Sequence, residues 1–131
     1  MLSDNEFVKQ LEAKTLDPVY FNHIGHLRLA WLYLSRHDFE RAHSLVDANI
    51  SAYANSLGET DKYHVTITYA LMKIIEKRIK RQNPKTFKEF LETNSDIIEN
   101  AVSVLCEYFT KDKLFSDQAK NSLLQPDLKS L

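Results

Sequence analysis

The chain contains few of the residues that reverse a polypeptide, with only two glycines and three prolines in 131 residues. A sheet of many strands needs a turn at every reversal, and glycine and proline make many of those turns. Their scarcity argues against an all-β fold and favours helices. We therefore expect an all-α fold, a compact bundle of five to seven helices in a single domain that spans residues 1–131.

Cysteine, signal-peptide features and long apolar runs are also scarce. The single cysteine, Cys106, cannot form an internal disulfide, and the N-terminal letters MLSDNEF lack the cationic start and apolar core of a signal peptide. We expect a cytoplasmic protein. No apolar run reaches the roughly 18 to 20 residues of a membrane span, because His23, His26 and Arg28 interrupt the longest candidate, so we expect no membrane partner.

Neither sign of charge dominates, since 17 Lys and Arg residues face 18 Asp and Glu residues and the net charge is −1. Such a chain has no basic field to hold a phosphate backbone, so we expect no nucleic-acid partner. A local cationic run consists of Lys77, Arg78, Lys80, Arg81 and Lys85. Cations are favoured at a helix C-terminus, so a solvated helix end is the expected interpretation of this run.

Two stretches have apolar residues on nearly every side of a helix, which predicts that both helices are enclosed by other elements. One is expected from the N-cap Asn22 to Arg36, and the other opens at Thr60 or Asp61 and ends in the cationic run. Other helices are predicted from Ser3 to Lys14, from Asp38 to Gly58, after Asn83-Pro84 as N-cap and first helical residue, from Ser95 to Phe109 and from Ser116 to Leu124. Residues 111–115 should connect the last two, and residues 125–131 should form an extended or loose tail.

Three histidines are the candidate metal ligands. His23 and His26 lie one turn apart at the start of the first enclosed helix, and His64 lies near the start of the second. Three neutral imidazoles that converge from two helix ends can bind a divalent transition metal, with the fourth position left to water, a ligand or a carboxylate. Nearby acids are Glu12, Asp17 and Asp61. The alternative is that these histidines bond backbone carbonyls and fill polar corners of a core.

Three further side chains are candidate ligand-binding residues: Arg28, Tyr63 and Thr68. Arg28 is a charge within an apolar run, so it needs either a carboxylate from a neighbouring helix, which we favour, or an anionic ligand. Tyr63 precedes His64 and could orient a ligand oxygen. For Thr66 and Thr68, a hydroxyl inside a helix more often bonds the carbonyl four residues back.

The segments FNHIGHLRLAW, KYHVTIT and LFSDQA resemble those of a family of small, uncharacterised helical bacterial proteins. The matching positions are Phe21, His23, His26, Leu27, Arg28, Ala30, Trp31, Tyr63, His64, Thr66, Thr68, Leu114, Phe115, Ser116, Ala119 and Pro126-Asp127-Leu128. The resemblance implies that the three histidines belong to one motif set. Gly25 departs from the pattern, which has a charged residue there. WLYLSRHDFERA also resembles one tetratricopeptide unit, but such units need about three copies to bury a core, so we interpret it as an ordinary helical hairpin.

These patterns lead to two functional hypotheses. In the first, a polar pocket between the two enclosed helices binds a metal or a small acidic molecule. His23, His26 and His64 would bind it, and Tyr63 and Arg28 would orient it. Hydrolytic, redox and storage roles all fit such a site. In the second, the chain is a non-catalytic helical interaction module or a homo-oligomer. A pocket requires the histidines to converge, whereas an interaction module requires an exposed apolar patch.

Overall fold

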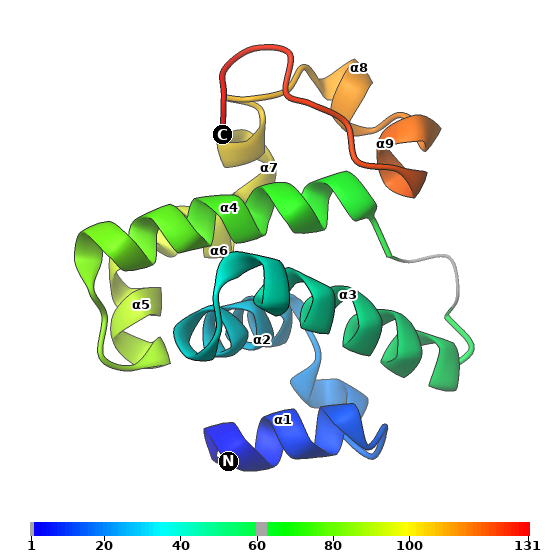
Figure 1. Cartoon of the computed structure of the whole chain (residues 1–131), viewed down its shortest axis with the longest axis vertical. Coiled ribbons are helices and arrows are strands. Elements are labelled where there is room, and N and C mark those ends of the chain that lie inside the picture. Colours follow the sequence, from blue (N-terminus) through cyan, green and yellow to red (C-terminus); the bar gives the residue numbers. More distant parts are fainter. Residues whose placement is uncertain (1, 60–62) are drawn as a thin grey trace. The chain divides into compact units, whose positions relative to one another are not determined.

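Helices are the regular structure of this chain in a computed structural model, which describes residues 2–59 and 63–131. In these two ranges it has nine α-helices, one 3-10 helix and no β-strand, so the predicted all-α fold is confirmed (Figure 1). Five α-helices have seven or more residues, within the predicted number, and four have four or five. No helix in the described ranges has the length and apolar character of a membrane span.

The residues group into two compact units, Met1–Tyr63 and His64–Leu131. We call them unit 1 and unit 2 and describe each by itself. The single domain expected from the length of the chain stays a prediction.

Unit 1 begins each of its helices with a side-chain cap. Its elements are α1 (Asp4–Glu12), the 3-10 helix η1 (Pro18–Tyr20), α2 (His23–Arg36) and α3 (Phe39–Ser56). The N-caps Ser3, Asn22 and Asp38 each accept a hydrogen bond from the backbone N–H three residues on, as the sequence predicts. These caps fix where the chain changes direction.

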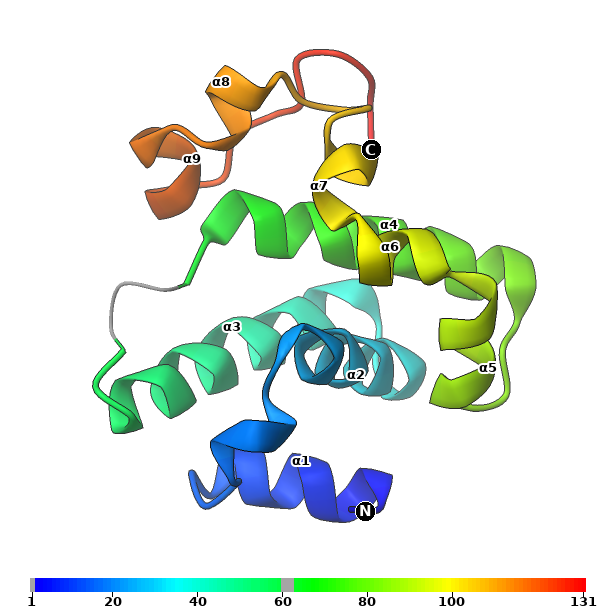
Figure 2. The same ribbon diagram turned by 180° about the vertical axis from the view of Figure 1, so that it is seen from behind.

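The helices α2 and α3 form an antiparallel hairpin that supplies most of the core of unit 1 (Figure 2). Leu27 and residues 29–33 of α2 are all buried, which agrees with the expectation that this helix is enclosed. α1 also packs on α3 and buries Phe7, Val8 and Leu11. Burial of such side chains is the main favourable contribution to folding.

Gly25 is required by the entry into α2. A Cβ atom at this position would lie 2.2 Å from the carbonyl oxygen of Tyr20, a backbone atom that cannot rotate away. The charged side chain that the family resemblance places here therefore has no room. The close approach instead lets η1 pack against the first turn of α2.

Unit 2 is built on one long helix and several short ones. Its elements are α4 (Val65–Gln82), α5 (Phe87–Thr93), α6 (Ser95–Glu99), α7 (Ala101–Leu105), α8 (Lys111–Leu114) and α9 (Asp117–Asn121). α7 and α9 pack against α4 (Figure 2). The apolar core of unit 2 includes Ala70, Met72, Ile74, Ile75, Phe90, Ile97, Val104, Leu105, Phe109, Leu114 and Ala119. The predicted start of α4 at Thr60 or Asp61 lies outside the described residues, and His64 is its N-cap.

Two predicted helix boundaries in unit 2 are wrong. Asn83 is not an N-cap: its backbone is left-handed, with φ of 50°, and its N–H donates to Ile79, so it ends α4. Thr86 caps α5 instead, by accepting from the N–H of Glu89. The helix predicted from Ser95 to Phe109 is broken at Asn100, where ψ is 56°, into α6 and α7.

The C-terminal part also differs from its prediction. Residues 111–115, expected to be a connector, contain the single-turn helix α8. Ser116 caps α9 as predicted, but this helix ends at Asn121 rather than Leu124. The chain then runs without regular structure through residues 122–131, which we call the C-terminal segment; Figure 1 shows it in red, returning from α9 towards α7.

Candidate functional site

His26 has one ring nitrogen available for a ligand. Its ring stacks on Phe21, with centroids 4.0 Å apart, while the side chain as a whole stays accessible to solvent. Nδ1 lies 2.8 Å from the carbonyl oxygen of Asn22 and must carry the proton, because a carbonyl only accepts. Desolvation of the ring lowers the pKa of His26, with a smaller contribution from His23, so the ring is neutral at pH 7 and Nε2 presents its lone pair.

His64 uses both ring nitrogens inside unit 2. Nδ1 accepts from the backbone N–H of Ile67 at 3.0 Å, which caps α4. Nε2 lies 3.0 Å from the carbonyl oxygen of Leu114, at the end of α8, and must be the donor. Burial lowers the pKa of this half-buried ring. A metal could bind His64 only by displacing one of these two bonds.

The three-histidine metal site stays a prediction. Within residues 2–59 and 63–131, no three His, Cys, Asp or Glu side chains are placed to hold one metal ion. His23 and His26 belong to unit 1 and His64 to unit 2. Of the predicted acids, Asp17 caps η1 through the N–H of Val19, and Asp61 lies outside the described residues.

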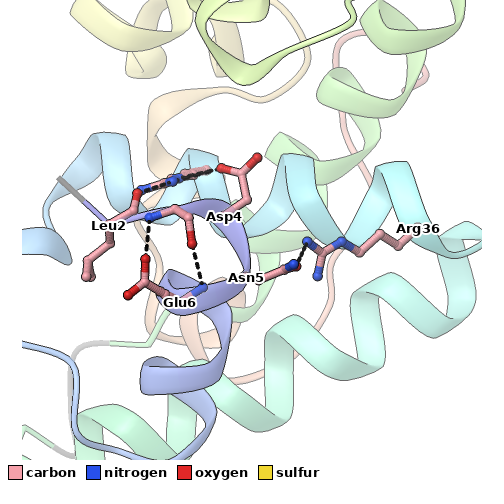
Figure 3. Close-up of polar contacts among 7 residues, drawn as sticks. Leu2, Asp4, Asn5, Glu6 and Arg36 are labelled. Carbon is pink, nitrogen blue, oxygen red and sulfur yellow. Dashed lines mark hydrogen bonds and ion pairs between the residues drawn. The ribbon is translucent and has the colours of Figure 1, made fainter.

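Arg28 pairs with a carboxylate from a neighbouring helix, as the structural interpretation expects. Its Nη2 atom lies 2.8 Å from Oδ1 of Asp4 in α1 and donates to the carbonyl of Leu2 at 3.0 Å. Its guanidinium carbon also lies 4.7 Å from the centre of the Phe7 ring. Figure 3 shows Asp4 and Leu2 at this contact, together with the bond from Arg36 to Asn5. Arg28 therefore joins α1 to α2, and its role towards a ligand stays a prediction.

Tyr63 and Thr68, the other two candidate ligand-binding residues, are half-buried near the start of α4. Tyr63 lies just before the N-cap, and the N–H of Thr68 donates to the carbonyl of His64 at 3.1 Å. Neither residue lines the cavity described next.

A cavity of about 260 Å³ lies within unit 2, between the N-terminal half of α4 and the C-terminal segment. Its lining consists of Thr66, Tyr69, Ala70 and Lys73 from α4, then Phe109, and Leu123, Leu124, Gln125, Pro126, Ser130 and Leu131 from the C-terminal segment. This lining mixes apolar side chains with polar ones, and the polar share of its accessible surface is the larger.

The hydroxyl of Thr66 fastens the C-terminal segment to α4. It donates to the carbonyl of Ser122 at 2.8 Å and accepts from the N–H of Leu124 at 3.1 Å. Thr66 is fully buried, and the carbonyl four residues before it belongs to residue 62, which lies outside the described residues. The residue therefore closes one side of the cavity.

A second set of bonds holds the far part of the C-terminal segment. The carboxylate of Asp127 accepts from the backbone N–H and the hydroxyl of Thr110, at 2.9 and 2.7 Å. The N–H of Leu128 donates to the carbonyl of Tyr108 at 2.9 Å, and the ammonium of Lys129 lies over the Tyr108 ring. Residues 125–131 have no regular structure, as expected, and they are tied down at several points.

One charged side chain, Lys73, is among the residues that line the cavity. Lys73 lines it, with its ammonium 4.0 Å from the carboxylate of Glu76 and 5.8 Å from the centre of the Tyr69 ring. Glu76 also pairs with Lys80, at 3.7 Å. Glu76 is thus shared between two lysines, and of these three side chains only Lys73 lines the cavity. Of the lining residues, Thr66 lies in the first turn of α4, where the helix dipole favours negative charge.

The cationic run at the end of α4 includes an arginine with a structural role. Arg78 makes two hydrogen bonds to the carboxylate of Asp96, at 2.6 and 2.8 Å, and a third to Asn94. These bonds lower the pKa of Asp96 and raise that of Arg78. Arg78 therefore joins α4 to the start of α6, while Lys77, Lys80 and Arg81 lie at the surface.

Several large apolar side chains are exposed, but they do not define a partner. In unit 1, Val19, Tyr20 and Ile24 follow one another around the junction of η1 and α2, with Val19 69% exposed. In unit 2 the most exposed are Phe115 and Leu128. The alternative hypothesis of an interaction module stays a prediction.

Comparison with known proteins adds no relative from which a function could be transferred. The sequence has no significant match to a protein-family model, to a curated protein or to a solved structure. The resemblance to helical bacterial proteins stays a prediction.

Sequence reasoning missed the residues that line the cavity. Thr66, Ala70 and Lys73 recur at helical spacing, which marks one face of α4 but does not reveal what covers it. Of the covering residues, Leu123 and Leu124 were predicted to end the last helix, and the others come from residues 125–131, which were expected to form an extended or loose tail. The Pro126-Asp127 pair was the one local signal, because it marks a turn after the last helix.

Proposed function

We propose that this chain is a non-catalytic binding protein that holds a small amphipathic anion in the cavity of unit 2. The single observation that carries the proposal is the composition of the lining, which combines apolar side chains with Lys73. The apolar side chains would bury the body of the ligand, and the ammonium of Lys73 would bind its acidic group. This keeps the expectation of a small acidic ligand and places it at α4 rather than at the histidines.

The volume limits the size of the ligand. Pockets for drug-sized molecules have volumes of roughly 300 to 1,000 Å³, so a cavity of about 260 Å³ suits a smaller molecule. A carboxylate with about ten non-hydrogen atoms, such as octanoate, is a suitable probe. At about 0.4 kcal/mol per atom it would bind with roughly millimolar affinity.

The test compares octanoate with 1-octanol, which has the same chain and no charge. Binding is measured by NMR through the methyl signals of Leu123 and Leu124. Octanoate should bind more tightly than 1-octanol, and Lys73→Met should weaken octanoate about tenfold while leaving 1-octanol unchanged, because a charged hydrogen bond contributes about 1.5 kcal/mol or more.

The matched control is Lys77→Met, which removes an exposed lysine of α4 that does not line the cavity. It should leave both affinities unchanged. Equal binding of octanoate and 1-octanol by the wild-type protein, or no shift of the cavity methyl groups with either probe, would contradict the proposal.

A further inference from the structure

His64 lies where a change of protonation would act on the cavity. It caps α4 through Nδ1, and the first turn of that helix contains Thr66, whose hydroxyl holds the C-terminal segment against α4. Its Nε2 atom binds the carbonyl of Leu114, which precedes α9 and the same segment. One imidazole thus caps the helix that forms one wall of the cavity and also binds the end of α8, which leads through α9 into the C-terminal segment.

The two bonds of His64 require one particular neutral tautomer. Nδ1 must offer a lone pair to the N–H of Ile67 while Nε2–H donates to Leu114. An imidazolium carries a proton on both nitrogens, so Nδ1–H would face the N–H of Ile67 as donor against donor. Protonation would therefore remove the cap and place positive charge at a helix N-terminus, where the helix dipole is also positive.

We propose that protonation of His64 opens the cavity, by fraying the first turn of α4 and displacing Thr66 from Ser122 and Leu124, and so releases the anion bound there. The inference of release rests on the proposed function. The opening itself does not, because it needs no ligand. The cavity would then bind its anion at neutral pH and release it in mildly acidic conditions.

The surroundings of the His64 ring favour its neutral form in the closed state. Several elements of unit 2 around His64 carry charged residues. These are Lys111, Asp112 and Lys113 on α8, Asp117 and Lys120 on α9, and Asp127 and Lys129 in the C-terminal segment. The first charged residue of α4 is Lys73, and α7 has no charged residue. Burial is the largest cause that lowers the pKa of His64, the bond to Leu114 opposes it, and Lys120 adds to it. The closed state therefore binds fewer protons, so it is favoured above the ordinary histidine pKa of about 6.5 and loses that advantage as the pH falls through the lowered pKa.

The first experiment uses the ligand-free wild-type protein. NMR follows the ring nitrogens of His64 and the exchange protection of the Leu124 amide from about pH 7.5 to about pH 5.8. Protection is expressed relative to an unfolded chain at the same pH. It should fall about fivefold as His64 becomes protonated, which is the change expected from the loss of one N-cap.

The matched variants are His64→Asn and His37→Asn. Asparagine is a good N-cap and does not titrate in this range, so His64→Asn should remove the pH dependence of Leu124 protection. His37 is exposed at the end of α2 in unit 1, and its replacement should leave the pH dependence unchanged. The inference would be overturned if protection of the Leu124 amide did not depend on pH in the wild-type protein, or if its pH dependence were unaltered in His64→Asn.

Octanoate binding at the same two pH values separates the inference from the proposed function. About fivefold weaker binding at the lower pH, absent in His64→Asn, supports both. Equal binding at both pH values while His64 titrates overturns release by protonation but leaves the anion site intact. Loss of Leu124 protection without octanoate binding at either pH refutes the proposed function and supports the opening.

Discussion

Replacing Thr66 by valine tests whether one hydroxyl holds the cavity closed. Valine has nearly the same shape as threonine, so the buried position stays filled while both hydrogen bonds, to Ser122 and from Leu124, are lost. Thr66→Ser is the matched control, because it keeps the hydroxyl and removes only a methyl group.

The magnitude follows from these two bonds. Each hydrogen bond contributes a net of about 1 kcal/mol, and the freed groups of Ser122 and Leu124 can bond to water because neither residue is buried. We therefore expect Thr66→Val to weaken the attachment of the C-terminal segment by about 2 kcal/mol. This corresponds to roughly a 30-fold change in the equilibrium between the attached and the detached segment.

Native-state hydrogen exchange measures this equilibrium directly. In Thr66→Val the Leu124 amide should lose roughly 30-fold in protection, whereas amides in the centre of α4, such as that of Ile75, should change much less, because the effect is a local opening. Octanoate should also bind more weakly to this variant. Unchanged Leu124 protection in Thr66→Val, or an equal loss in Thr66→Ser, would refute the role assigned to the hydroxyl.

Three further predictions concern unit 1 and are checked by equilibrium unfolding. Gly25→Ala should lower the free energy of unfolding by about 1 to 3 kcal/mol, because the clash with Tyr20 outweighs the better helix propensity of alanine; a more stable variant would contradict this. Arg28→Met should cost about 1 to 2 kcal/mol by removing the pair with Asp4, the bond to Leu2 and the contact with Phe7, and an unchanged denaturation midpoint would argue against that link. Burial raises the pKa of Tyr33 to about 12, so the folded state favours the protonated phenol and should lose about 2 kcal/mol of stability as the pH rises from about 10 to 12. Burial also raises the pKa of Tyr53, so Tyr33→Phe should lose about 2 kcal/mol less than the wild-type protein over this range, and an equal loss in the two proteins would refute the assignment.

Helix starts were the part of the fold most readily predicted from sequence. Ser3, Asn22, Asp38 and Ser116 are all N-caps in the structure, as expected. An N-cap depends on a side chain and a backbone N–H only three residues away, so the determining chemistry lies within one turn. Such local agreement between sequence and structure is what makes a boundary predictable.

Asn83 shows where local chemistry is ambiguous. Asparagine suits an N-cap, but it also tolerates the left-handed conformation that ends a helix. Three residues later, Thr86 offers a competing cap, and the carboxylate of Glu89 accepts from the N–H of Lys85 to complete the start of α5. Because these two contacts make Thr86 the N-cap of α5, Asn83 ends α4 rather than starting α5.

The cavity could not be predicted because its walls are far apart in sequence. Thr66 binds residues 56 and 58 positions later, and nothing in the KYHVTIT segment around it indicates those partners. The apolar period of α4 indicates that one face is covered, but it does not identify the covering segment. Residues 122–124 were predicted to end the last helix and residues 125–131 to be extended or loose, whereas side-chain bonds to Thr66 and Thr110 hold both parts in place.

The histidines show that residues grouped by one pattern can have opposite chemistry. The carbonyl of Asn22 fixes the proton of His26 on Nδ1, which leaves Nε2 to bind a ligand, whereas the carbonyl of Leu114 fixes the proton of His64 on Nε2 and the helix cap occupies Nδ1. A metal on Nδ1 of His64 would remove the same cap that protonation removes. Metal coordination by Nδ1 of His64 and the N-cap that keeps the cavity closed therefore exclude each other, because both require the lone pair of Nδ1.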